Sequence, residues 1–335
     1  MFSKNMIALP QDLEAAEKLQ DFLPEKIIDM HAHLIDTDHI PAMGKKLSER
    51  VVLDINTYKK EMSPLLCNPK ELRLNIIAYP DREMGNISSD CLAKCDSFIN
   101  EQLNKDTSSY GEIIVTPSCT VDSIEKRLTN GRIKGFKCYH LTAPKEVTWN
   151  CSIGEYLPEA AWEVANKHKM YITLHMVKDK ALADEDNLNY IRAMAKKYPD
   201  AVLILAHAAR SFAAWTGVEA VEKVADSENV WFDFSAVCES PAMIQIIKKA
   251  GISRCMWGSD YPVCRARGKA ISLADTFYWI YQNDLDNFTS KTKVNNWLIA
   301  LENLYAVKQA ATLTDLTGKD IEDLFYNNAL KLLER

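Results

Sequence analysis

Two features that would point to a nucleic-acid-binding or membrane protein are missing from this sequence of 335 residues. It has no basic excess, because 46 acidic side chains outnumber 40 lysines and arginines and give a formal net charge of -6. Without a positive field, binding to nucleic-acid phosphates or to anionic membrane surfaces is disfavoured. No run approaches the roughly 18 apolar residues that a membrane-spanning helix needs. We therefore expect a soluble protein without nucleic-acid or membrane partners.

Paired cysteine motifs are also missing. The nine cysteines are scattered, and no two of them form a Cys-x-x-Cys pair. This spacing argues against a disulfide framework and against a cysteine-based zinc knot. The first 26 residues contain no apolar core of signal-peptide length. The resulting expectation is a cytoplasmic protein in a reducing environment.

What the sequence does contain is a regular alternation of β-rich runs and helical patterns. Such alternation is typical of a parallel sheet wrapped by helices, and 335 residues suit an α/β barrel, which needs about 250 and tolerates insertions. Eight runs follow this pattern, at residues 27–33, 72–79, 112–117, 132–138, 171–175, 202–207, 230–235 and 254–260. We therefore predict a (β/α)8 TIM-like barrel that forms one domain over residues 1–335.

Two helical segments fall outside this pattern. Residues 11–23 place apolar side chains on one stripe, which predicts a helix under the barrel, within an N-terminal extension of residues 1–26. Residues 294–311 show the same stripe within a helical insertion of residues 281–313. For the second stripe we favour core packing over a role as a lid or a dimer surface. The oligomeric state is left open, with a homodimer as one possibility.

Histidines and one aspartate stand at the ends of four of the runs. His31 and His33 belong to the first run, His175 and His207 end later runs, and Asp260 ends the last. Side chains two apart in a strand face the same way, and the carboxyl ends of barrel strands converge on one mouth. The sequence therefore predicts one metal site. Nitrogen and oxygen ligands of this kind suit zinc, with an open position for water.

The run that contains Lys137 leaves one question open. Successive side chains of a strand alternate between its faces. Either Lys137 and Tyr139, or Cys138 and His140, therefore point into the barrel, but not both pairs.

Arginines follow two of the ligand-bearing runs, where loops are expected to cross the barrel mouth. Arg210 comes three residues after His207, and Arg265 and Arg267 follow the last run. A guanidinium binds a carboxylate through paired hydrogen bonds, so this mouth suits a small acidic substrate. Arg210 and Arg265 are the substrate-binding candidates, with a solvated loop charge as the alternative for each. Tyr139 is a third candidate, because its hydroxyl can donate to a developing oxyanion.

Several motifs, in the order in which they occur, resemble the amidohydrolase superfamily. They are Asp-x-His-x-His at 29–33, Gly-Phe-Lys at 135–137, His175, His207, Trp-Gly-Ser-Asp-Tyr-Pro at 257–262 and Asn-Asn-Ala-Leu-Lys-Leu at 327–332. The sequence is most similar to the amidohydrolase-related branch, which includes lactonases, hydratases and decarboxylases of small carboxylates. This resemblance runs from about residue 27 to the carboxyl end but leaves out residues 281–313.

The resemblance implies a role for each of these residues. A metal ion would be held by His31, His33, His175 and Asp260. Asp260 would also act as general base, and His207 would lie beside the water or the substrate carbonyl and steady the oxyanion. A cation that lowers the pKa of water to about 7 is consistent with these roles.

Lys137 leaves the number of metal ions open. In binuclear members of the superfamily a carboxylated lysine on the fourth strand bridges two ions, and in mononuclear relatives a lysine there touches substrate or a ligand. One divalent ion is favoured, with zinc ahead of manganese, iron and nickel. Lys137 is counted with Asp260 and His207 among the catalytic candidates.

The predicted function is that of a metal-dependent hydrolase. It would use metal-activated water to cleave a small lactone or amide that carries a carboxylate. The alternative is a decarboxylase or hydratase of a small unsaturated carboxylic acid, built on the same ligands. A non-catalytic metal-binding barrel is disfavoured, because structural zinc is usually closed by four protein ligands rich in cysteine.

Overall fold

The computed structural model describes residue 6 and residues 8–39, 49–79, 89–288 and 295–335. Its main sheet has nine strands in the order β2-β1-β3-β4-β5-β6-β7-β8-β9, and every neighbouring pair except β1 and β2 is parallel. The strands are β1 (Lys26–Asp36), β2 (Val52–Leu53), β3 (Glu71–Ala78), β4 (Tyr110–Ile114), β5 (Ile133–Tyr139), β6 (Tyr171–His175), β7 (Val202–Leu205), β8 (Val230–Asp233) and β9 (Cys255–Met256).

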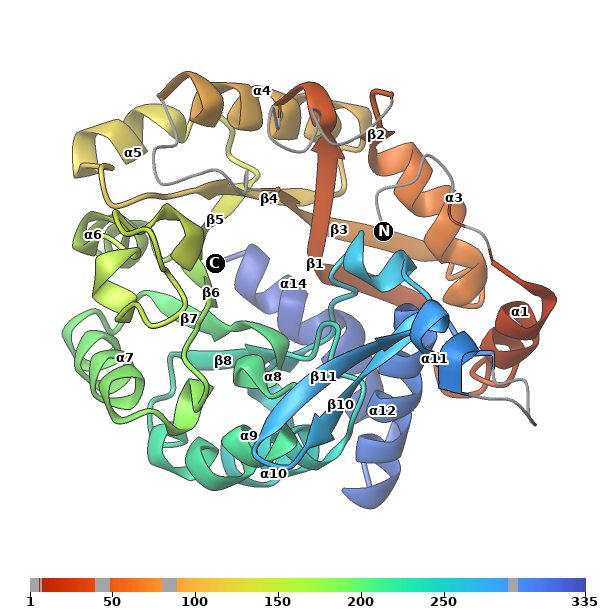
Figure 1. Ribbon diagram of the computed structural model, residues 1–335. Coiled ribbons are helices and arrows are strands. Elements are labelled where there is room, and N and C mark those ends of the chain that lie inside the picture. The colour runs from red at the N-terminus through yellow and green to blue at the C-terminus, as the bar shows by residue number, and fades with distance from the viewer. Residues whose placement is uncertain (1–5, 7, 40–48, 80–88, 289–294) are drawn as a thin grey trace.

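The main sheet curls so that the chain at β9 returns to β1, the neighbour of the end strand β2, and Figure 1 shows the strands arranged as a ring. The segment after β9 lies against β1, where the backbone N–H of Asp260 donates to the carbonyl of His31 at 2.8 Å. The N–H of His33 donates in turn to the carbonyl of Tyr261 at 2.7 Å. The result is a mixed α/β fold consistent with a TIM-like barrel.

Helices surround this ring, except that α8 and α14 lie over its centre in the view of Figure 1. They are α1 (Pro10–Glu17), α3 (Ile55–Leu65), α4 (Ser89–Lys105), α5 (Val121–Arg127), α6 (Glu159–His168), α7 (Glu185–Lys197), α8 (Ala206–Arg210), α9 (Ala214–Ala220), α10 (Pro241–Ala250), α11 (Gln282–Phe288), α12 (Ile299–Leu313), α13 (Gly318–Glu322) and α14 (Asn328–Leu333). Local capping sets some of these boundaries. Asp184, for example, accepts hydrogen bonds from the first amides of α7. Among the described residues, no helix is both long and apolar enough to cross a bilayer.

Apolar side chains fill the ring near the amino-terminal ends of its strands. There, residues such as Ile28, Tyr171 and Val202 pack with Ala329 and Leu333 of α14. With this end closed by apolar packing, the carboxyl-terminal ends of the strands are left to carry polar groups.

The parallel strands fall on the eight expected runs, and four of them, β4, β7, β8 and β9, are shorter than expected. β7 ends at Leu205, and β9 covers only Cys255–Met256. The backbone beyond each strand enters the left-handed region, with φ of 59° at His207 and 56° at Asp260, and a strand cannot continue through such residues. The antiparallel hairpin of β10 (Gly268–Leu273) and β11 (Thr276–Tyr281) was not expected.

Candidate metal centre

The carboxyl-terminal ends of the strands bring the predicted ligands together. Ligand atoms of His31, His207 and Asp260 all lie within 4.8 Å of one another, and the three residues are buried. Nε2 of His33 lies 3.2 Å from Nε2 of His31 and 3.7 Å from Oδ1 of Asp260. Nδ1 of His175 lies 3.2 Å from Nε2 of His207. The tightest group therefore includes His207, which the sequence had placed beside the ligands and not among them.

Asp233, the last residue of β8, orients two of these histidines. Its Oδ2 lies 2.9 Å from Nδ1 of His31, and its Oδ1 accepts from the backbone N–H of His207 at 3.0 Å. Nδ1 of His207 is engaged by the carbonyl of Ser235 at 3.1 Å. Both rings thus present an unprotonated Nε2 to the cluster, as metal-ligating histidines do when an outer partner holds the other nitrogen. Sequence reasoning missed Asp233, which lies inside the predicted run of residues 230–235 and not at its end.

Burial keeps the clustered imidazoles neutral. It lowers the pKa of His31 and His33. It also lowers the pKa of His207 to about 3, and repulsion from a protonated His31 is the second cause of that shift. A neutral imidazole has the lone pair that a cation requires. Burial raises the pKa of the Asp260 carboxyl, and Lys137 opposes that shift. Neutral imidazoles beside a carboxylate form a donor set that fits zinc and similar divalent ions.

β5 turns Lys137 and Tyr139 toward the cluster, which answers the question that strand alternation left open. Nζ of Lys137 lies 3.0 Å from Nε2 of His31. The hydroxyl of Tyr139 lies 2.9 Å from Nε2 of His33. Cys138 is buried between them in sequence and contacts a backbone carbonyl of β6 instead.

This geometry can be compared with known proteins. The family described as Amidohydrolase matches the sequence over residues 28–335. The chain belongs to the amidohydrolase family. The predicted resemblance is therefore confirmed, as is the prediction of an enzyme of the amidohydrolase family. No curated protein matches the sequence.

Solved structures share the fold of this amidohydrolase at low sequence identity. A zinc-bound amidohydrolase from Burkholderia multivorans is 12% identical with a TM-score of 0.58, over 92% of this chain and 99% of that chain. A Pseudomonas putida protein assigned as a 2-pyrone-4,6-dicarboxylic acid hydrolase is 13% identical with a TM-score of 0.56, over 93% and 98%. The 5-carboxyvanillate decarboxylase of Sphingomonas paucimobilis is 11% identical with a TM-score of 0.55, over 92% and 99%. At these identities the likeness shows the shared fold alone.

Two of the arginines near the amidohydrolase site are paired with protein carboxylates. Nε and Nη2 of Arg265 each lie 2.8 Å from a carboxylate oxygen of Glu61, and the Arg265 side chain is 1% exposed. Arg267 is paired with Asp12. These pairs hold α3 and α1 against the segment after β9. The geometry gives Arg265 a structural contact, and its predicted role in substrate binding stays a prediction.

A buried glutamate on β4 is a further polar group inside the ring. Oε1 of Glu112 accepts from Nδ2 of Asn75 at 2.5 Å and from the hydroxyl of Thr173 at 2.8 Å. Its Oε2 is buried without a hydrogen-bond partner among the described residues. Burial raises the pKa of Glu112 to about 7, although Lys137 opposes the shift. Sequence reasoning missed this residue, whose signal was an acidic side chain at the start of an apolar run.

Glu112 should make the protein less stable as the pH rises from about 5 to about 8. Its pKa is higher in the folded chain than its ordinary 4.5, so its protonated form stabilises the fold at low pH. That contribution, about 3 kcal/mol, is lost as the pH passes through 7. In Glu112→Gln, which cannot ionise, urea unfolding should show a smaller loss between the two pH values. Exposed Glu163→Gln is the control, and equal pH slopes in wild type and Glu112→Gln would contradict this assignment.

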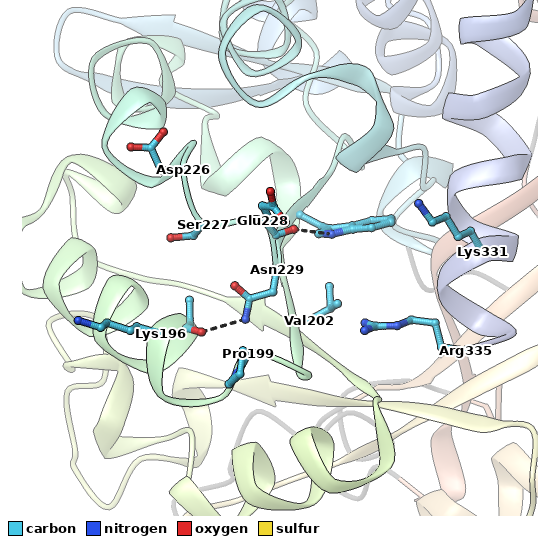
Figure 2. A pocket seen from close by; sticks show the side chains of 11 residues that line it. Lys196, Pro199, Val202, Asp226, Ser227, Glu228, Asn229, Lys331 and Arg335 are labelled. Atoms are coloured by element: carbon cyan, nitrogen blue, oxygen red, sulfur yellow. Dashed lines mark hydrogen bonds between the residues drawn. The ribbon is translucent and has the colours of Figure 1, made fainter.

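A surface pocket of about 600 Å³ lies at the other end of the ring (Figure 2). Its lining includes Val202, the first residue of β7, and Asn229 and Trp231 at the start of β8. Two of its polar side chains already have protein partners, since Nε1 of Trp231 donates to the carbonyl of Glu228 at 3.2 Å and Nδ2 of Asn229 donates to three backbone carbonyls. We assign this pocket no part in the chemistry.

Proposed function

We propose that this protein is a metal-dependent hydrolase that cleaves a small lactone or amide bearing a carboxylate. The observation that carries the proposal is the buried group of His31, His207 and Asp260, with their ligand atoms within 4.8 Å of one another. In this proposal His31, His33, His175 and Asp260 hold one divalent ion, with zinc as the first choice. Residues 1–335 would form one domain with a closed (β/α)8 barrel, working in the cytoplasm.

The chain's own residues divide the work of hydrolysis. A divalent cation held by His31, His33, His175 and Asp260 would supply a water of lowered pKa, near 7, and would polarise the scissile carbonyl. The Asp260 carboxylate takes a proton from the attacking water and returns it to the leaving group as the bond breaks. The hydroxyl of Tyr139 can donate to the oxyanion that develops on the substrate.

The tautomer of His207 changes one predicted role. Its Nδ1 is engaged by the carbonyl of Ser235 at 3.1 Å, so the neutral ring carries its proton there. Nε2 then has a lone pair and no proton to donate to an oxyanion. In the proposed mechanism His207 therefore accepts a proton or completes the ligand set, and oxyanion stabilisation passes to Tyr139.

Metal content and turnover together test this proposal. We expect elemental analysis to find about one divalent ion per chain, since the proposed ligands His31, His33, His175 and Asp260 would hold a single ion. Removal of the ion by a chelator should abolish hydrolysis of a panel of carboxylated lactones, and added zinc should restore it. Full activity of the metal-free protein would refute the proposal. A content near two ions per chain would move Lys137 and His207 into the ligand shell.

A decarboxylase of a small unsaturated carboxylic acid is the second candidate. The fold shared with the 5-carboxyvanillate decarboxylase of Sphingomonas paucimobilis favours it. Release of carbon dioxide or bicarbonate from unsaturated diacids, without hydrolysis of the lactones, would select this reaction.

A further inference from the structure

Asp260 lies at a strained point of the backbone. Its φ is 56°, in the left-handed region that a residue with a Cβ keeps only where its surroundings hold it. Its N–H donates to the carbonyl of His31 at 2.8 Å, and its carbonyl accepts from the N–H of Val263 at 2.7 Å. The place of its carboxylate beside the histidines therefore depends on how firmly the chain on either side of it is held.

The chain just before Asp260 is held by a second buried carboxylate, that of Asp29 on β1. Oδ1 of Asp29 accepts from the N–H of Ser259 at 2.9 Å and from the N–H of His31 at 3.0 Å. Its Oδ2 accepts from the hydroxyl of Tyr58 on α3 at 2.5 Å. Asp29 thus ties β1 to the segment that carries Asp260, and α3 supports this tie.

The chain just after Asp260 is held by Glu61, which lies one turn beyond Tyr58 on α3. Oε2 of Glu61 accepts from the hydroxyl of Tyr261 and from Nε of Arg265, both at 2.8 Å. Its Oε1 accepts from Nη2 of Arg265 at 2.8 Å. The Glu61 side chain is 9% exposed, so water and salt screen this ion pair little. Because residues three apart share a helix face, α3 reaches both sides of Asp260.

Aromatic packing and a backbone contact reinforce these polar contacts. The rings of Tyr58 and Tyr261 have centres 5.1 Å apart and planes 72° apart, and both side chains are buried. The carbonyl of Tyr261 accepts from the N–H of the predicted ligand His33 at 2.7 Å. A displacement of Tyr261 would therefore be passed to β1 as well as to Asp260.

We propose that Glu61 is a positioning residue that holds Asp260 in the geometry of a metal ligand. It acts through its two partners, Tyr261 and Arg265. This inference rests on the proposed function, because the metal centre that Glu61 serves is the one proposed above. Loss of its carboxylate would leave a buried arginine cation unpaired, and the segment would shift to bring that cation to water. The strained backbone of Asp260 would then relax, and its carboxylate would move away from the histidines.

Zinc affinity and stability, measured on the same variants, test this role. Glu61→Gln keeps the size of the side chain and removes its charge. Its zinc affinity, measured by competition with a chromophoric chelator, should fall roughly 10- to 100-fold, as for other outer partners of metal ligands. The fold should persist with a lower stability in urea.

Asp96→Asn is the matched control, because it breaks an ion pair of the same geometry away from the predicted ligands. Oδ2 of Asp96 on α4 accepts from Nε of Arg127 on α5 at 2.6 Å, and its Oδ1 accepts from Nη2 at 2.9 Å. Both side chains are largely buried. Asp96→Asn should also lose stability in urea, but its zinc affinity should stay that of wild type.

Milder variants keep the test decisive if Glu61→Gln fails to fold. Tyr261→Phe removes only the hydroxyl that donates to Glu61, and its zinc affinity should fall roughly 2- to 10-fold, as expected for one hydrogen bond. Glu61→Asp keeps the charge on a shorter side chain, and its affinity should lie between those of wild type and Glu61→Gln. Lys60→Gln, at an exposed position of α3, should change neither affinity nor stability.

The possible outcomes separate this inference from the proposed function. Wild-type zinc affinity in Glu61→Gln and Tyr261→Phe would overturn the inference, whatever the stability of these variants. Equal losses of affinity in Glu61→Gln and Asp96→Asn would also overturn it, because a general loss of stability would explain both. A wild-type protein that binds no zinc would overturn the inference together with the proposed metal centre. If wild type binds zinc but hydrolyses none of the lactones, only the hydrolase proposal fails, and a selective loss of affinity in Glu61→Gln would still support the role of Glu61.

Discussion

Replacing His31 with alanine is expected to remove the metal ion and catalytic turnover together, while the fold persists. Nε2 of His31 lies 3.2 Å from Nε2 of His33 and 3.0 Å from Nζ of Lys137, and its Nδ1 is held by Asp233. Loss of a ligand should cost more than the roughly 10- to 100-fold that loss of an outer partner costs in such sites. Elemental analysis and steady-state rates measure the two effects, and circular dichroism reports the fold.

His168→Ala is the matched control for this experiment. His168 lies at the end of α6, where its Nε2 contacts Glu125 on the surface, and its loss should leave metal content and rate unchanged. A His31→Ala protein that is metal-free and fully active would rule out the proposed mechanism. A variant that keeps its metal but loses activity would show that His31 acts on the substrate and not as a ligand.

Gly258→Ala should be nearly as damaging, although it removes no functional group. A Cβ at this position would lie 2.6 Å from Cβ of His31 and 3.0 Å from its backbone nitrogen. β1 cannot easily retreat, because Asp260 N–H donates to the His31 carbonyl at 2.8 Å across the same junction. We expect a loss of stability of about 1–3 kcal/mol from overpacking, together with weaker metal binding as His31 is displaced.

Gly131→Ala is the control for the glycine substitution. An added Cβ at Gly131 would meet no atom within 4 Å, so stability and metal affinity should stay near those of wild type. Urea unfolding and zinc titration measure both quantities. Wild-type stability and affinity in Gly258→Ala would show that the contact with His31 is unimportant.

Much of the metal centre could be predicted because its residues carry local signals. His31 and His33 share a strand face, and His175 ends a short apolar run, so period and position identify them without any long-range information. Asp233 ends β8 in the structure but lies two residues before the end of its predicted run. It was missed because a carboxylate that supports a ligand cannot be told by sequence from one that caps a loop.

Other features depend on contacts that no local pattern encodes. Alternation alone allowed either face of β5 to point inward, and only the packed ring selects Lys137 and Tyr139. From the sequence, Arg265 is either a substrate-binding residue or a solvated charge on a loop. In the structure it pairs with Glu61, which lies 204 residues away in sequence. The surroundings of Arg210 depend on a hairpin whose aromatic side chains pack against it from a distant part of the chain.

The backbone junction between β1 and the segment after β9 joins the last element of the ring to the first. Asp260 and His31 face each other across it both as main-chain partners and as neighbours in the cluster. Closure of the ring therefore brings Asp260 next to the histidines, and a chain whose ring stayed open would lack the proposed metal site. Metal binding at the proposed site would accordingly report tertiary closure, which secondary-structure content alone cannot show.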